Sequence, residues 1–223
     1  MKIKGAIFDM DGTIIDSLMF WDCLWKQIGE KYMGDPDFKP SDEVNKNVRT
    51  MIYTDAMAYF KDYYKIPGKT EDFLRSASVG ILDFYKDVAK IKLGADELLS
   101  YLKSQNIKLC LASATSMPEI KHALSCHGLL KYFDIVLSCV DIGVGKDRPD
   151  IYLEATEKMG ISPEDICVFE DSYVALETAK KVGFQTVGIF DRYNFCQDRL
   201  KKAADIYLNE GHSLSELISE VNN

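Results

Sequence analysis

Short apolar runs alternate with longer amphipathic stretches along most of the chain. The apolar runs have strand length and are rich in β-branched residues, whereas the intervening segments carry apolar residues at three- and four-residue steps, as in 95–105. Runs of this kind are typical of strands buried on both faces and connected by helices. The pattern therefore predicts an α/β fold with a mostly parallel sheet flanked by helices. The predicted strands are 3–8, 107–112, 134–138, 166–169 and 186–189.

The connection between the first two predicted strands is unusually long. About a hundred residues separate them, far more than a crossover connection requires. Helical spacing is the main pattern in this segment, with apolar stripes over 18–32 and 73–88. A further helix is predicted from Ser41, a suitable N-cap, to a stop at 66–68. The aromatic residues of these stripes are interpreted as the interior of a small helical bundle rather than as a ligand cage.

The insertion divides the predicted structure into two parts. We predict a Rossmann-like α/β core formed by residues 1–15 and 93–223, with an inserted α-helical cap domain over 16–92. Because the chain passes between the two parts twice, we expect hinge motion between them.

Charge and cysteine content restrict the possible partners and location. The formal net charge of −8 argues against sequence-independent binding to nucleic acid, which requires a broad cationic face. Six scattered cysteines without a CxxC pair are typical of reduced thiols. The first apolar stretch is too short for a signal peptide or a membrane span. We therefore expect a cytoplasmic monomer that binds neither nucleic acid nor membrane.

Polar residues follow four of the predicted strands at the point where each strand ends. The carboxyl ends of parallel strands meet at one edge of a sheet, so these residues are expected to converge on one crevice. An acidic pair alone could equally be a solvated turn or a helix cap; convergence from four strand ends favours a site. The residues are Asp9 and Asp11 in FDMDGTIIDS, Ser113 in LASAT, Lys146 in GKDRPDIY, and Glu170 and Asp171 in VFEDS.

The predicted cluster suits phosphoryl chemistry. Gathering Asp9, Asp11 and Asp171 at one point is costly without a cation, and hard oxygen ligands favour Mg²⁺. One carboxylate can attack phosphorus while its neighbour two residues later protonates the leaving oxygen. Gly12 allows a sharp turn between them. Further donors for the phosphoryl oxygens are Ser113, the amide of Ala114, and Lys146.

These four motifs resemble the signature motifs of the haloacid dehalogenase superfamily, in the expected order and over essentially the whole chain. The cap position resembles the subfamily that includes β-phosphoglucomutase and phosphoglycolate phosphatase. The resemblance implies that Asp9 is the nucleophile, which becomes an aspartyl phosphate, and that Asp11 is the general acid and base. It further implies phosphate contacts from Thr13, Ser113 and Lys146. Mg²⁺ would be held by Asp9, the backbone carbonyl of Asp11, and Asp171, with Glu170 beside or behind it.

Departures from the family pattern bear on the substrate. Trp21 stands where the mutase branch usually carries a histidine, and Leu93 replaces the usual proline of the return hinge. Asp147 and Arg148 follow Lys146, where small residues are common. We therefore predict a phosphoric monoester hydrolase acting on a small phosphorylated metabolite. A β-phosphoglucomutase-like mutase and a non-enzymatic phospho-switch are the alternatives.

Two arginines of the predicted cap are candidates for substrate specificity. Arg49 and Arg75 fall near positions where family members reach toward the substrate, and a second phosphate or a carboxylate would suit them. The alternative is that both lie on solvated helix faces.

Two other patterns are not interpreted as sites. GVGKD at 143–147 lacks the spacing of a nucleotide-binding loop. The histidines make no metal-ligand spacing with the cysteines and are interpreted as surface or structural residues: His122, His127 and His212.

Overall fold

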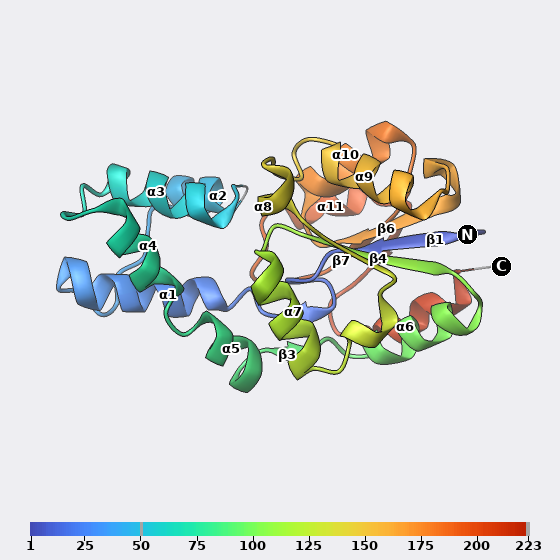
Figure 1. The fold of residues 1–223 in the computed structure, drawn as a ribbon, viewed down its shortest axis with the longest axis horizontal. Helices are drawn as coiled ribbons and strands as arrows, with labels where there is room; N and C mark the ends of the chain where they lie inside the picture. Colours follow the sequence, from blue (N-terminus) through green and yellow to red (C-terminus); the bar gives the residue numbers. More distant parts are fainter. Residues whose placement is uncertain (50, 222–223) are drawn as a thin grey trace.

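A parallel sheet forms the centre of the larger part of the molecule (Figure 1). The computed structural model describes residues 1–49 and 51–221. Within them, six parallel strands pair in the order β5-β4-β1-β6-β7-β8, which confirms the predicted α/β class. The strands are β1 (Gly5–Phe8), β4 (Lys108–Ser113), β5 (Ile135–Ser138), β6 (Ile166–Glu170), β7 (Gln185–Ile189) and β8 (Ile206–Leu208).

The sequence missed one strand of this sheet. All five predicted strands are present with slightly shifted ends, whereas β8 was not predicted. This strand has three residues and pairs only with β7 at the edge of the sheet. Its apolar run is therefore too short to stand out from the flanking helix and loop.

Both faces of the sheet are buried, because successive side chains of a strand point to opposite sides. In β1, Ala6 and Phe8 belong to one apolar cluster and Ile7 belongs to the other. Helices α6 and α7 and the 3-10 helix η4 cover the first cluster, and α9 and α10 cover the second. The helices of this part are α6 (Ala95–Ser104), α7 (Met117–Cys126), η2 (Leu130–Tyr132), α8 (Cys139–Ile142), α9 (Asp150–Met159), η3 (Pro163–Asp165), α10 (Tyr173–Val182), α11 (Gln197–Ala203) and η4 (Leu214–Ser219).

The long connection after β1 is mainly helical. Figure 1 shows α1 to α4 at the left, beyond the carboxyl ends of the strands. They pack around their own apolar cluster, which includes Trp25, Phe60 and Phe73. The helices of the long connection are α1 (Phe20–Ile28), a π-helix η1 (Gly29–Met33), α2 (Asp42–Val48), α3 (Tyr53–Tyr63), α4 (Thr70–Ser78) and α5 (Ile81–Asp87).

Two predicted helices of this connection are each divided in the structure. The helix that begins after Ser41 ends at Val48, and α3 starts only after Ile52, whose backbone is extended. The apolar stripe over 73–88 is interrupted at Gly80, which has a φ of +88° and separates α4 from α5. Spacing alone therefore overestimated the helix lengths. Near the ends of these two predicted helices, the side chains of Tyr63 and Val88 are 50% and 46% exposed.

The two chain crossings between the parts are held together. Strand β2 (Ile15–Asp16) pairs antiparallel with β3 (Lys90–Ile91). Next to them, α5 packs with α7 on the sheet side, and Ile81 and Phe84 join the first core cluster. The division into a core and a cap over 16–92 stays a prediction.

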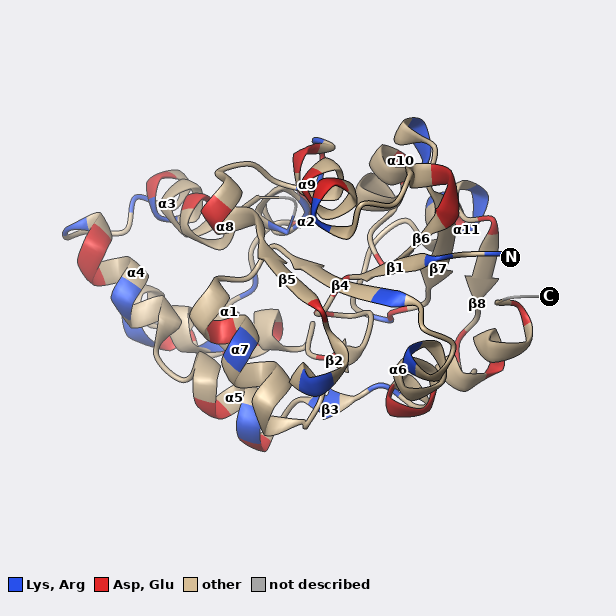
Figure 2. Cartoon of the chain, turned by 45° about the vertical axis from the view of Figure 1, so that its right-hand side comes forward, with Lys and Arg blue, Asp and Glu red and all other residues tan. Residues whose placement is uncertain are grey.

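The cysteines, the surface charges and the lengths of the helices bear on the predictions made from composition. Each of the six cysteines is a free thiol, as predicted, and Cys110, Cys139 and Cys167 are buried. Figure 2 shows acidic and basic residues interspersed along the outer helices. No helix in 1–49 or 51–221 is both long enough and apolar enough to cross a membrane.

Candidate active site

One pocket lies where the carboxyl ends of β1, β4 and β6 face the inserted helices. Trp21, Arg49 and Tyr53 line it from the inserted side, and Phe195 lines it from the loop after β7. Most of the predicted site residues meet there, as expected for the edge of a parallel sheet. Those that line the pocket are Asp9, Asp11, Ser113, Ala114, Lys146, Glu170, Asp171 and Arg49, whereas Thr13 and Arg75 do not.

The loop after β1 is compact because several backbone amides converge on one carbonyl. Thr13, Ile14 and Ile15 donate to the carbonyl of Met10 over 3.4, 3.1 and 3.0 Å. Gly12 has a φ of +86°, and a Cβ added there would lie 2.3 Å from Oδ2 of Asp171. Only glycine therefore lets this loop pass so close to the acidic residues after β6.

Three buried carboxylates form a cluster at the base of the pocket. One oxygen from each of Asp9, Glu170 and Asp171 lies within 4.8 Å of the others. Lys146 donates to Oδ1 of Asp9 and, over 2.8 Å, to Oε2 of Glu170. The amide of Ser172 donates to Oε1 of Glu170 over 3.1 Å. The loop before α9 thus brings a cation into direct contact with two of the three acids.

The electrostatics of this cluster favour an additional cation. Burial, followed by repulsion from Glu170 and Asp9, holds the pKa of Asp171 well above its ordinary value. Burial and Asp9 likewise raise the pKa of Glu170, although Lys146 opposes them. Burial alone would lower the pKa of Lys146, but Asp9 and Glu170 outweigh it and raise the pKa. Lys146 contacts only two of the three carboxylates, so these oxygen donors fit a hard divalent ion such as Mg²⁺.

Asp11 points away from this cluster and toward the inserted helices. Its Oδ1 accepts hydrogen bonds from Ser17 over 2.7 Å and from Tyr85 over 2.8 Å, and its Oδ2 accepts one from Thr115 over 2.8 Å. Burial, followed by repulsion from Asp9, raises the pKa of Asp11, although the three hydroxyl donors act in the opposite direction. Asp9 and Asp11, which are separated by one residue, therefore have different partners and different surroundings.

The predicted phosphate-binding residues take different positions. Ser113 is buried at the end of β4, and its Oγ accepts a hydrogen bond from the amide of Thr115 over 3.1 Å. Ala114, the next residue, is exposed in the pocket. Thr13 is fully buried, and its hydroxyl donates to Oδ1 of Asp171 over 3.2 Å. Thr13 thus lies behind Asp171, where it orients a carboxylate of the cluster.

The two candidate arginines are placed very differently. Arg75 is exposed on α4, outside the pocket, as the solvated-face alternative predicts. Arg49 lies between two rings, 5.6 Å from the centroid of Trp21 and 5.3 Å from that of Phe195. Its Nη1 donates to the backbone carbonyl of Tyr193 over 2.8 Å. Burial lowers the pKa of Arg49, opposed by nearby acids.

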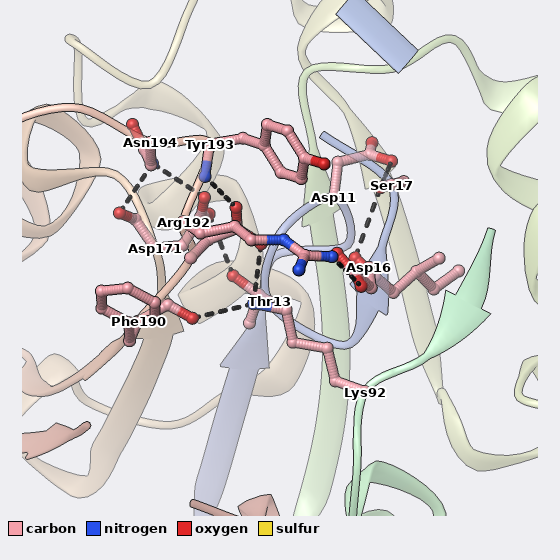
Figure 3. Close-up of polar contacts among 12 residues, drawn as sticks. Asp11, Thr13, Asp16, Ser17, Lys92, Asp171, Phe190, Arg192, Tyr193 and Asn194 are labelled. Carbon is pink, nitrogen blue, oxygen red and sulfur yellow. Dashed lines mark hydrogen bonds and ion pairs between the residues drawn. The ribbon is translucent and has the colours of Figure 1, made fainter. Parts of the chain in front are cut away.

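Sequence reasoning missed several polar neighbours of the acids. Ser17 and Thr115 lie inside or beside the predicted motifs, so a search for hydroxyls near strand ends could have found them. Tyr85 and Asn194 carry no local signal, because only the tertiary fold brings them to Asp11 and Asp171. Figure 3 shows Asn194 directed at Asp171 from one side and Thr13 from another.

The fold and the acidic pocket define an α/β enzyme, and comparison with known proteins gives its family. The model of the haloacid dehalogenase-like hydrolases matches residues 3–183, so the chain belongs to this family of hydrolases, as the motifs indicated. The chain is 28% identical over 185 residues to the phosphorylated carbohydrates phosphatase of Thermotoga maritima, covering 83% of this chain and 84% of that protein. It is 27% identical over 199 residues to the β-phosphoglucomutase of Bacillus subtilis, covering 84% and 83% of the two chains.

Solved structures share the same fold. CbbY from Rhodobacter sphaeroides in complex with phosphate superimposes with a TM-score of 0.80 at 22% identity, covering 96% of each chain. The β-phosphoglucomutase of Clostridium difficile gives a TM-score of 0.76 at 21% identity, covering 98% of this chain and 96% of that one. At these identities the likeness shows the fold alone.

Proposed function

We propose that the protein is a Mg²⁺-dependent phosphatase that hydrolyses a small phosphorylated metabolite through an aspartyl phosphate on Asp9. The contrast between Asp9 and Asp11 carries this proposal. Asp9 lies in the carboxylate cluster and contacts Lys146. Asp11 instead accepts hydrogen bonds from three hydroxyls, and its own pKa is raised. A general acid must hold a proton, which the raised pKa of Asp11 favours, and the position of Asp9 beside Lys146 suits a group that attacks phosphorus.

In the first step, a carboxylate oxygen of Asp9 forms a bond to phosphorus while the ester P–O bond breaks. Asp11 donates its proton to the leaving oxygen, so the alcohol departs neutral. In the second step, Asp11 takes a proton from water, and the water oxygen attacks the phosphorus. The acyl-phosphate P–O bond then breaks, which releases inorganic phosphate and regenerates both carboxyl groups.

The remaining residues bind and orient the phosphoryl group. Lys146, the Ser113 hydroxyl and the amide of Ala114 are the proposed donors to its oxygens, and Thr13 supports them. Mg²⁺ would be held by Asp9, Glu170, Asp171 and the backbone carbonyl of Asp11, and when bound it neutralises charge on the carboxylates and the phosphoryl group.

We propose that residues 16–92 act as a cap that excludes water from the pocket. The hydrogen bond from Tyr85 on α5 to Asp11 supports this, because it joins the inserted helices to the proposed acid. Arg49 lines the pocket from the same side and is the proposed contact for a second anionic group of the substrate. Exposed Arg75 could reach a substrate only after rearrangement of α4. The monomeric state, the cytoplasmic location and the lack of nucleic-acid or membrane partners stay predictions.

A substrate screen tests the function directly. Purified protein with Mg²⁺ is incubated with a panel of phosphorylated metabolites, and both free phosphate and isomerised product are measured. We expect phosphate release that the D9N variant lacks. Isomer without phosphate release would replace the proposal by a mutase of the β-phosphoglucomutase type, and neither product would favour the phospho-switch.

A further inference from the structure

The loop between β7 and α11, residues 190–196, lies outside every motif that the sequence singled out. It nevertheless reaches the carboxylate cluster through Asn194. The side-chain Nδ2 of Asn194 donates to both the backbone oxygen of Asp171, over 2.7 Å, and its Oδ2, over 2.8 Å. Thr13 donates to the other carboxylate oxygen, Oδ1, over 3.2 Å. Both oxygens of Asp171 are therefore held by neutral donors from two different loops (Figure 3).

Contacts that do not involve Asp171 hold this loop in place. Asp191 is buried and pairs with Lys92 over 2.9 Å, at the second chain crossing. Lys92 also donates to the carbonyl of Phe190 over 2.9 Å. The amide of Tyr193 donates to Oδ1 of Asp191 over 2.8 Å, and Nε2 of Gln197 donates to the backbone carbonyl of Asp191 over 2.7 Å. The backbone around Asn194 is thus held by contacts within the protein.

The same loop contacts the inserted helices on its other side. Arg49 donates to the carbonyl of Tyr193, the residue directly before Asn194. Arg192 approaches Asp16 of β2 at 3.7 Å, and these side chains are 60% and 33% exposed. The loop therefore spans from the cluster to the cap side of the pocket.

We propose that Asn194 is a positioning residue that sets the orientation of the Asp171 carboxylate for Mg²⁺ binding. A carboxylate beside two other acids tends to rotate away from them, and the amide of Asn194 opposes that rotation with a donor that adds no charge. Because the donor is neutral, it orients the oxygen without competing with the cation. A protonated lysine in the same place would compete with the cation for the carboxylate. Groups that orient metal ligands in this way typically change metal affinity by 10–100-fold. The inference takes its metal from the proposed function, while the contacts themselves do not depend on it.

The test compares two variants of the full chain by their response to Mg²⁺ in the absence of substrate. N194A removes the donor to Asp171, whereas Q197A breaks the bonds from Gln197 to the carbonyls of Asp191 and Asn194 in the same loop, neither of which touches Asp171. The thermal unfolding midpoint is measured against MgCl₂ concentration at constant ionic strength, and the dissociation constant follows from the rise in the midpoint. For N194A we expect Mg²⁺ affinity weaker by about tenfold or more, and for Q197A affinity within about twofold of the parent.

Kinetics add a readout that a general loss of structure would not produce. With N194A, the Mg²⁺ concentration for half-maximal rate should rise by the same factor as the dissociation constant, while kcat at saturating Mg²⁺ stays within a few-fold of the parent. Unchanged Mg²⁺ affinity in N194A, or an equal loss in Q197A, would overturn the positioning role. If the parent binds Mg²⁺ in an Asn194-dependent way but hydrolyses no phosphate ester, the proposed function fails and the positioning role stands.

Discussion

Replacing Lys146 by methionine should destabilise the protein far more than a lysine substitution normally does. The Lys146 side chain lies between Asp9 and Glu170 with 10% of its surface exposed, and methionine keeps much of its volume while removing the charge. At an effective dielectric constant of about 20, two unit charges 2.8 Å apart attract by about 6 kcal/mol. Desolvation of each ion offsets much of this, and removal of one partner from a buried pair typically costs about 3–5 kcal/mol. The thermal midpoint should fall by roughly 6–20 °C near pH 8 without Mg²⁺.

The loss of stability in K146M should be larger at high pH than at low pH. Folding raises the pKa of Glu170 from 4.5 to about 7, first through burial and then through Asp9. The folded protein therefore keeps a proton that the unfolded chain releases, and the free energy of unfolding falls as pH rises through this interval. Without Lys146 the pKa rises further, so the deficit of K146M should be largest near pH 8 and smaller near pH 5.

Denaturation of K146M and the parent at both pH values, with and without Mg²⁺, measures this effect. Mg²⁺ should restore part of the stability of the variant, because the ion replaces the missing positive charge. The matched control is K158M, since Lys158 lies on the surface and pairs with Glu154 at 3.1 Å. It should change stability by less than about 0.5 kcal/mol. Equal stability of K146M and the parent near pH 8 without Mg²⁺ would refute the claim that Lys146 balances the buried acids.

Three further substitutions and removal of the metal test the chemistry of the site. D9N should abolish turnover with the fold retained, and residual phosphatase activity with an unchanged melting curve would contradict a nucleophilic role for Asp9. D11N should slow both steps by about 10²–10⁴-fold, so parent rates on both p-nitrophenyl phosphate and a natural ester would remove Asp11 from acid and base catalysis. G12A should lower both activity and stability, because its Cβ would lie 2.3 Å from Oδ2 of Asp171 at a φ of +86°; a fully active, equally stable G12A would show that the loop can yield. Excess chelator should stop the parent enzyme, and full activity in its presence would rule out the metal.

Much of the core of the site follows from the chain because each residue lies at the end of a strand. Asp9, Ser113 and Asp171 follow or end apolar runs that periodicity identifies, and parallel pairing then brings those ends together. Helix limits in the insertion were less predictable. Gly80 interrupts a stripe that reads as continuous, because hydrophobic spacing does not record where the backbone leaves the helix.

The sequence alone determined the α/β class, the existence of a long helical insertion, and the meeting of acids from separate strands. Each of these depends on local periodicity and on the geometric rule that parallel strands end at one edge. Only the tertiary structure decided that Asp11 turns toward Tyr85 while Asp171 is held by Asn194. These pairs are separated by 74 and 23 residues, and their contacts arise from the way loops pack once the sheet has formed. Local sequence contains no record of that packing, so the orientation of each carboxylate belongs to the fold as a whole.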